Sequence, residues 1–418
     1  MNMTLLILVL VTVQVGLLLT FFSRRLKATI QKNRLTSWIT FFMLQGGFVV
    51  LLLAGGYGEE RWQLFSGLKR FLGSGEIPRA RTIPLVGDPG WIRFAESSKP
   101  ALPRPDFSDP VKLHQWQSSA RKFLRDSVFE LGENDVPLKV EYRRISEEDV
   151  GQGLSRVLLA FKAFDGTEIP AYLFIPGALS GTQRPGPAVV VVPGHVRVSQ
   201  SGIEQTAGIV DSYQHGNALR LAEAGIVALT FELRGFGELG PPFNTEHRLV
   251  AYNAILNGTF YKAIIAKDIR YAFDLLASLA GVDPERVGIT GASYGGEMSV
   301  AYAALDERVK AVVFQAYGGT LGPRVGLARG NEKDLHYCRV IPGGGALFRE
   351  DFVRLLAPRP VLGIRGREER FKVAPDFLGA VEKAWETFGV PQNFELEVLP
   401  GGHQYFIEPA AEFLRKHL

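Results

Sequence analysis

The chain has 418 residues, of which 46% are hydrophobic and 22% are charged, which excludes a minimal disulfide-stapled domain and a disordered chain. Lys and Arg total 47 against 43 Asp and Glu, and a net charge of +4 over this length does not indicate a nucleic-acid-binding protein. The single cysteine, Cys338, excludes an intrachain disulfide and a cysteine-based metal site.

The first 58 residues contain two long stretches without a charged side chain, Met1–Ser23 and Leu35–Gly58. A membrane-spanning helix needs about 20 mostly apolar residues, and both stretches are long enough. Neither has the one polar face that is typical of a helix in a soluble domain. We therefore predict two transmembrane helices within residues 1–58. A cleaved signal peptide is the alternative for the first stretch, but it lacks the basic start of such peptides.

The loop between these helices, residues 23–36, is basic and has no acidic side chain. Short basic loops remain on the cytoplasmic side of a membrane. Both ends of the helical hairpin are therefore expected on the non-cytoplasmic side of the membrane, which makes the rest of the chain extracytoplasmic. The basic residues of the loop are Arg24, Arg25, Lys27, Lys32 and Arg34.

Residues 59–110 are rich in proline and glycine and have little apolar periodicity, so we predict a linker or a wrapping arm. Apolar residues at helical spacing follow from Pro110 to about Leu131. On this pattern we assign residues 111–153 to a helical N-terminal extension.

Residues 154–418 alternate between strands and helices. A hairpin is expected first, with strands Leu154–Phe164 and Glu168–Pro176 joined by the Asp165-Gly166 turn. Short apolar runs that suit parallel strands covered on both faces follow at Ala188–Val192, Ile226–Phe231, Arg286–Thr290, Val309–Phe314, Pro360–Ile364 and Phe394–Leu399. Helices are expected at Tyr213–Ala224, His247–Ala280, Tyr294–Leu305, Ala374–Phe388 and Tyr405–Leu418. This order predicts a doubly wound, mostly parallel α/β sheet with its chemistry at the carboxyl ends of the strands.

Ser293 is the candidate nucleophile because it lies in a Gly-x-Ser-x-Gly segment, Gly291–Gly295, between a predicted strand and a predicted helix. Side chains at Gly291 and Gly295 would collide in such a tight turn, and Gly296 would let the helix pack close to the sheet. A structural glycine-rich turn is the alternative interpretation.

Serine needs a base, and the base needs an acid to fix its tautomer, in the chain order serine, acid, histidine. His403 is the candidate base because it follows a predicted strand, whereas His215, His247 and His336 have no such placement. Glu369 is the first candidate acid, Glu368 the second and Asp376 the third; a surface charge run is the alternative for Glu369.

Two backbone N–H groups should stabilise the oxyanion that forms on attack. One donor is expected from Tyr294, directly after the nucleophile. The other is expected from His195 in the loop after the strand Ala188–Val192, with Val196 as the alternative in register.

The sequence resembles the α/β-hydrolase superfamily from roughly Leu154 to Leu418, and within it the acetyl xylan esterases and dienelactone-hydrolase-like esterases. The resemblance implies a serine hydrolase of carboxylic esters without a metal or organic cofactor. The family usually has Asp where this chain has Glu369, and its His-Gly donor loop is here Pro193-Gly194. The stretches that carry the resemblance are Val192–His195, Phe231–Glu238, Gly291–Glu297, Ala304–Val313, Leu356–Pro360 and Pro400–His403.

We therefore predict a membrane-anchored serine esterase with a small-molecule ester as substrate, no nucleic-acid partner and an oligomeric state that the sequence does not indicate. A peptidase of the prolyl-oligopeptidase type is one alternative, although the roughly 100 residues between the predicted membrane helices and the hydrolase domain are too few for a propeller of four or more blades. A catalytically silent hydrolase fold that serves only for binding is the other, and the presence of Ser293, His403 and a possible acid in the expected order argues against it.

Overall fold

The computed structural model describes residues 103–132, 136–177, 185–196, 200–240, 247–317, 349–369 and 375–418. The predicted transmembrane hairpin within residues 1–58 lies outside these residues, as does most of the predicted linker 59–110. Among the helices in the described ranges, none is both long and apolar enough to cross a membrane.

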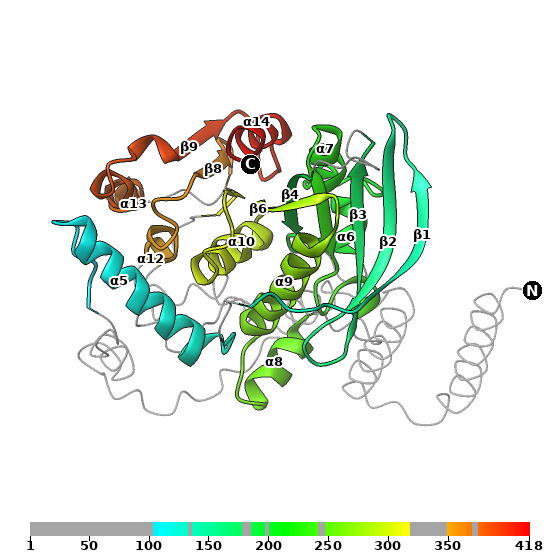
Figure 1. The fold of residues 1–418 in the computed structure, drawn as a ribbon, viewed down its shortest axis with the longest axis horizontal. Coiled ribbons are helices and arrows are strands. Elements are labelled where there is room, and N and C mark those ends of the chain that lie inside the picture. The colour runs from blue at the N-terminus through cyan, green and yellow to red at the C-terminus, as the bar shows by residue number, and fades with distance from the viewer. Residues whose placement is uncertain are drawn as a thin grey trace, which may run out of the picture. The chain divides into compact units, whose positions relative to one another are not determined.

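The described residues form one nine-stranded sheet with the strand order β1-β2-β3-β5-β4-β6-β7-β8-β9 (Figure 1). The pairs β1–β2, β2–β3 and β3–β5 are antiparallel, and every other neighbouring pair is parallel. The prediction of a mostly parallel α/β sheet is confirmed. The strands are β1 Tyr142–Asp149, β2 Leu154–Lys162, β3 Glu168–Pro176, β4 Gly186–Val192, β5 Val227–Phe231, β6 Val282–Ala292, β7 Val312–Gln315, β8 Val361–Gly366 and β9 Phe394–Leu399.

Helices cover both faces of the sheet, so that successive residues of a central strand enter different cores. In β4, Val190 packs in one hydrophobic cluster and its neighbour Val191 in the other, as the two-residue period of a strand requires. The first cluster also takes residues from α5, α9, α10, α12 and α13, and the second from α7 and α14. The bounds are α5 Pro110–Phe123, η2 Leu124–Val128, α6 Gly202–Thr206, α7 Asn217–Glu223, η3 Gly237–Leu239, α8 Arg248–Leu256, α9 Tyr261–Ser278, α10 Tyr294–Leu305, α12 Arg349–Arg354, α13 Pro375–Thr387, η6 Pro391–Asn393 and α14 Ile407–His417.

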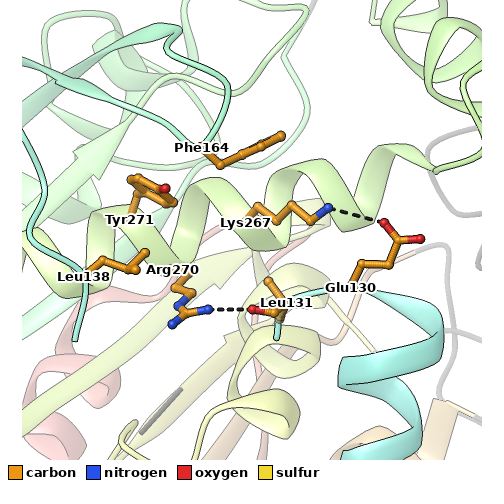
Figure 2. A pocket seen from close by; sticks show the side chains of 7 residues that line it. All are labelled: Glu130, Leu131, Leu138, Phe164, Lys267, Arg270 and Tyr271. Carbon is orange, nitrogen blue, oxygen red and sulfur yellow. Dashed lines mark hydrogen bonds and ion pairs between the residues drawn. The ribbon is translucent and has the colours of Figure 1, made fainter. Parts of the chain in front are cut away.

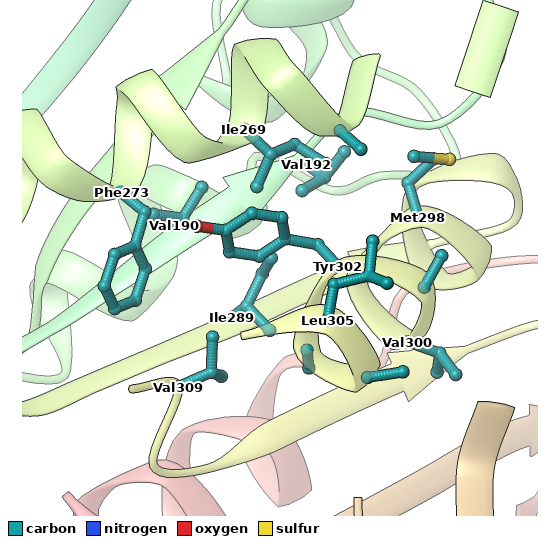
Figure 3. Packing of buried hydrophobic residues seen from close by; sticks show 14 of the residues in the cluster. Val190, Val192, Ile269, Phe273, Ile289, Met298, Val300, Tyr302, Leu305 and Val309 are labelled. Carbon is teal, nitrogen blue, oxygen red and sulfur yellow. The ribbon is translucent and has the colours of Figure 1, made fainter. Parts of the chain in front are cut away.

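The first cluster holds α10 and α9 against the sheet (Figure 3). Ile289 from β6, Ile269 from α9 and Val300 from α10 are all fully buried there. Full burial of one aliphatic side chain contributes about 1.5–3 kcal/mol. This packing fixes the position of the strand-to-helix turn that joins β6 to α10, and that turn carries Ser293.

Two elements differ from the sequence-based expectation. The extension 111–153 was expected to be helical, yet β1 lies near its end. All eight residues of β1 are exposed and most are polar, so the strand has no apolar alternation that could reveal it. The single helix expected over His247–Ala280 is divided into α8 and α9, because Gly258 has a left-handed φ of +77° between them.

Candidate active site

Ser293 occupies the turn between β6 and α10, at the carboxyl edge of the sheet. Its backbone has φ 57° and ψ −121°, a strained combination for a residue with a side chain. The flanking glycines are required by close approach, because a Cβ on Gly291 would lie 2.6 Å from the Val192 carbonyl oxygen and a Cβ on Gly295 would overlap the same oxygen. The tight strand-to-helix turn expected from the sequence is therefore present.

The loops after β8 and β9 bring Glu369 and His403 together. The two strands are parallel neighbours, and the loops that follow them are joined by a hydrogen bond of 3.0 Å from the Glu368 N–H to the Gly401 carbonyl. Glu369 Oε1 lies 3.3 Å from His403 Nδ1. The Glu369 side chain is 4% exposed and that of His403 is 39% exposed, so the imidazole is open to solvent while its partner is buried.

Of the three candidate acids, the structure brings Glu369 to His403. The Glu368 side chain is exposed on the same loop. Asp376 is the second residue of α13, and its side chain is not among those the structure describes. The interpretation of Glu369 as a member of a solvated charge run does not fit its burial.

The Ser293 hydroxyl has a neighbour that the sequence analysis did not single out, Tyr213. Burial raises the pKa of the Tyr213 phenol and the neighbouring Ser293 side chain lowers it, and the centroid of the Tyr213 ring lies 5.2 Å from that of His403. No direct hydrogen bond joins the side chains of Ser293 and His403, both of which the structure describes. Catalytic hydrogen bonds are often formed only once the substrate is bound. Tyr213 therefore contacts both the candidate nucleophile and the candidate base.

The loop after β4 places His195 beside the Ser293 turn. The Gly194 N–H donates to Gln214 Oε1 at 2.7 Å, and the His195 carbonyl accepts a hydrogen bond from the Tyr213 hydroxyl at 3.0 Å. The rings of His195 and Tyr294 stack with centroids 4.5 Å apart and an angle of 26° between their planes. The structure therefore brings together the two residues that were expected to supply backbone donors to the oxyanion.

Two histidines that the sequence analysis set aside lie close to this site. His247 is buried at the start of α8, with its ring centroid 4.7 Å from that of His195. His215 Nε2 lies 3.3 Å from Oε1 of Gln404, the residue after His403. Neither histidine directly follows a strand, as expected from the sequence, and His336 lies outside the described residues. Further aromatic residues that pack against His247 are Phe236 and Tyr261.

The loop after β5 is held by Arg234. Its guanidinium donates to both carboxylate oxygens of Asp268, at 2.7 and 2.9 Å, and also to Asp165. The hydrogen bonds from Arg234 lower the pKa of the Asp165 carboxyl. A paired arginine of this kind fixes a loop and is not available for chemistry.

Glu232 ties this loop to the segment that follows the donor loop. Its carboxylate is 1% exposed and accepts hydrogen bonds from Ser201 Oγ at 2.6 Å and from the Gly202 N–H at 2.9 Å. Burial raises the pKa of Glu232 from 4.5 to about 7, although these hydrogen bonds act in the opposite direction. Because the pKa is higher in the folded state, the stability that this group contributes is fully present below pH 4.5 and is lost as the pH rises through about 7.

We predict that Glu232→Gln removes this part of the pH dependence. The amide oxygen can still accept from the Gly202 N–H, and the amide NH2 can donate to Ser201 Oγ, without a buried charge. Between pH 5 and pH 8 the free energy of unfolding of the wild type should therefore fall by about 2 kcal/mol more than that of the variant. Urea unfolding at the two pH values measures the difference. Glu412→Gln, on an exposed position of α14, is the control. Equal pH dependence in Glu232→Gln and the wild type would contradict the prediction.

A cavity of about 280 Å³ lies between α9 and the turn after β2, and none of the candidate site residues lines it (Figure 2). Two of its polar groups are engaged by the protein itself: Lys267 forms an ion pair of 3.6 Å with Glu130, and Arg270 donates to the Leu131 carbonyl. Within the described ranges, no group of three or more His, Cys, Asp and Glu side chains could hold a metal ion. The cavity is lined by Glu130, Leu131, Leu138, Phe164, Lys267, Arg270 and Tyr271.

Comparison with known proteins gives a family for the first part of this domain. The family model of acetyl xylan esterase (AXE1) matches residues 138–317, a range that contains His195 and Ser293 but not Glu369 or His403. The hydrolase YtaP of Bacillus subtilis (strain 168) is 27% identical over 242 residues, which cover 57% of this chain and 77% of that protein.

Solved structures extend the likeness over most of the chain. A structure described as an acetyl xylan esterase from Bacteroides fragilis NCTC 9343 superposes with a TM-score of 0.61 at 18% identity, over 77% of this chain and 83% of that one. A glucuronoyl esterase from Solibacter usitatus superposes with a TM-score of 0.56 at 17% identity, over 77% of this chain and 99% of that one. The predicted resemblance is confirmed: residues 138–317 match the acetyl xylan esterase family, and the described residues share their fold with the two esterase structures above.

Proposed function

We propose that the protein is a serine esterase that cleaves carboxylic esters through an acyl-enzyme on Ser293. The observation that carries this proposal is the convergence of the Ser293 turn, the Glu369–His403 pair and the His195 loop at the carboxyl edge of one sheet. In an open α/β sheet this edge is where ligands bind.

In the proposed reaction the Ser293 hydroxyl exchanges its contact with Tyr213 for one with His403 Nε2 and attacks the ester carbonyl. His403 takes the serine proton and then gives it to the departing alcohol. Glu369, 3.3 Å from Nδ1, holds the tautomer and stabilises the imidazolium. A water molecule activated by His403 then hydrolyses the acyl-enzyme and regenerates the serine.

Negative charge develops on the carbonyl oxygen during attack. The Tyr294 N–H, in the first residue of α10, is the proposed first donor, and the positive end of the helix dipole supports it. The second proposed donor is the backbone N–H of His195, with Val196 as its alternative. Loss of one such donor costs about 100- to 1,000-fold in kcat in serine hydrolases, so the orientation of this loop is a large part of the proposed activity.

The relatives suggest the class of ester, because they are described as esterases of acetylated xylan and of glucuronoyl groups. We propose short acyl esters of a saccharide alcohol as substrates. Detergent-purified protein should hydrolyse p-nitrophenyl acetate with a higher kcat/KM than the butyrate and octanoate esters, and should release acetate from acetylated xylan oligosaccharides. Hydrolysis of peptide p-nitroanilides but of no ester would favour the peptidase alternative, and no turnover of either class would favour a silent hydrolase fold.

We also propose that two helices within residues 1–58 anchor the enzyme and place the hydrolase domain outside the cytoplasm. The support is the pair of uncharged stretches and the five basic residues between them. A reporter active only outside the cytoplasm, fused after Leu418, should be active. A silent reporter there, with an active cytoplasmic reporter at the same site, would reverse the orientation.

A further inference from the structure

We propose that Tyr213 is a positioning residue of this active site, whose hydroxyl holds the oxyanion-donor loop in place beside the Ser293 turn. The inference rests on the proposed esterase mechanism. Tyr213 belongs to the segment between α6 and α7, far in sequence from Ser293 and His403.

The first contact orients the donor loop. The Tyr213 hydroxyl donates to the His195 carbonyl at 3.0 Å. In a planar trans peptide the carbonyl of one residue and the N–H of the next point in opposite directions. Holding the His195 carbonyl therefore fixes the direction of the Val196 N–H, and it restricts the rotation of the peptide that carries the His195 N–H. This one hydrogen bond therefore constrains both the Val196 N–H and the His195 N–H, the two alternatives for the second oxyanion donor.

The neighbouring residue holds the same loop at a second point. Gln214 Oε1 accepts a hydrogen bond from the Gly194 N–H at 2.7 Å, and Gln214 is fully buried. A Cβ on Gly194 would overlap the Tyr213 hydroxyl oxygen and would lie 2.7 Å from the Ala292 carbonyl oxygen. Glycine is therefore required at this position, where the donor loop passes between the Tyr213 hydroxyl and the carbonyl of Ala292, the residue that precedes Ser293.

The remaining contacts of Tyr213 involve the nucleophile and the base. The Tyr213 hydroxyl has only one proton, which is donated to the His195 carbonyl, so toward the neighbouring Ser293 side chain the phenol oxygen can act only as an acceptor. Burial raises the pKa of the Tyr213 phenol far above its ordinary value, so the phenol keeps this proton across the range in which an esterase works. The Tyr213 ring lies 5.2 Å from the His403 ring, and the Tyr213 carbonyl accepts the Tyr405 N–H at 2.8 Å.

The test compares two Tyr→Phe variants that each remove one hydroxyl. Tyr213→Phe should lower kcat by about 10- to 100-fold with KM changed by less than about 2-fold, because the donor loop loses its orientation while the substrate still binds. Its rate of labelling by a fluorophosphonate should fall by a similar factor. Tyr302→Phe is the matched control, since the Tyr302 hydroxyl is also buried and donates to Asp306 at 2.7 Å, at the far end of α10. Tyr302→Phe should lower the melting temperature and leave kcat unchanged.

A wild-type kcat in Tyr213→Phe would overturn the inference, and so would an equal loss of kcat in Tyr302→Phe. If Tyr213→Phe does not fold, 4-fluorophenylalanine at position 213 fills the space of the hydroxyl but has no proton to donate to the His195 carbonyl. Its kcat should also fall by about 10- to 100-fold, and a wild-type kcat in this variant overturns the inference. Inactivity of the wild-type protein would instead contradict the esterase proposal, so the two failures can be distinguished.

Discussion

Ser293→Ala should abolish ester hydrolysis, with a loss of at least about 1,000-fold in kcat, and should remove labelling by a fluorophosphonate. The reason is that the proposed covalent bond forms on the Ser293 oxygen, which no other group replaces. Serine and alanine are alike in having a Cβ, so the backbone strain at φ 57° is present in both and the fold should be retained. Hydrolysis of p-nitrophenyl acetate, together with the melting temperature, measures the two expectations.

Ser299→Ala is a suitable control for this experiment. Ser299 lies on the same helix, α10, is fully buried, and donates to the Gly295 carbonyl at 2.7 Å. Loss of this hydrogen bond should lower the free energy of unfolding by about 1 kcal/mol and leave labelling by the fluorophosphonate at the wild-type level. Labelling of Ser293→Ala at the wild-type level would exclude Ser293 as the nucleophile, whatever the effect on hydrolysis.

The central part of the fold could be predicted because burial leaves a clear pattern in the sequence. Strands β4 and β5 are covered on both faces, and their sequences are mostly apolar runs between turn residues. The turn at Ser293 could be predicted because a tight strand-to-helix turn needs glycines at fixed spacing, and the structure has the close approaches at Gly291 and Gly295 that explain them. The exposed strand β1 has no such pattern, since it is held to β2 by backbone hydrogen bonds and by the exposed Glu148–Arg156 ion pair, and not by buried apolar side chains.

The parts of the site that could not be predicted depend on where the fold brings loops together. Tyr213 follows no strand and lies in no motif, and its position beside Ser293 results from the packing of the segment before α7 against the loop after β9. His247 was set aside because it follows no strand, but α8 starts beside the donor loop and brings its ring to His195. Sequence spacing indicates the end of a strand, whereas contacts between two loops require the three-dimensional arrangement.

Glu369→Gln should lower kcat by about 100- to 10,000-fold, the second large effect that we expect. Glu369 Oε1 faces His403 Nδ1 at 3.3 Å from a side chain that is only 4% exposed, so little solvent weakens its interaction with the imidazolium. An amide in this place has no charge to offer and can favour the wrong tautomer of the base. The same substitution at the exposed Glu368 is the matched control, one residue earlier on the same loop, and it should change kcat by less than about 3-fold.

Glu369→Asp separates the charge of this residue from its reach. The family that this chain resembles usually has Asp at the position, and removal of one methylene withdraws the carboxylate by about 1.5 Å. Because the present contact is already 3.3 Å, the shorter acid cannot reach Nδ1 unless the loops after β8 and β9 move closer together. We expect Glu369→Asp to lose about 10-fold or more in kcat while KM stays near the wild-type value. Wild-type kcat in both Glu369→Asp and Glu369→Gln, together with a large loss in Asp376→Asn, would show that the acid lies on α13 and not at the end of β8.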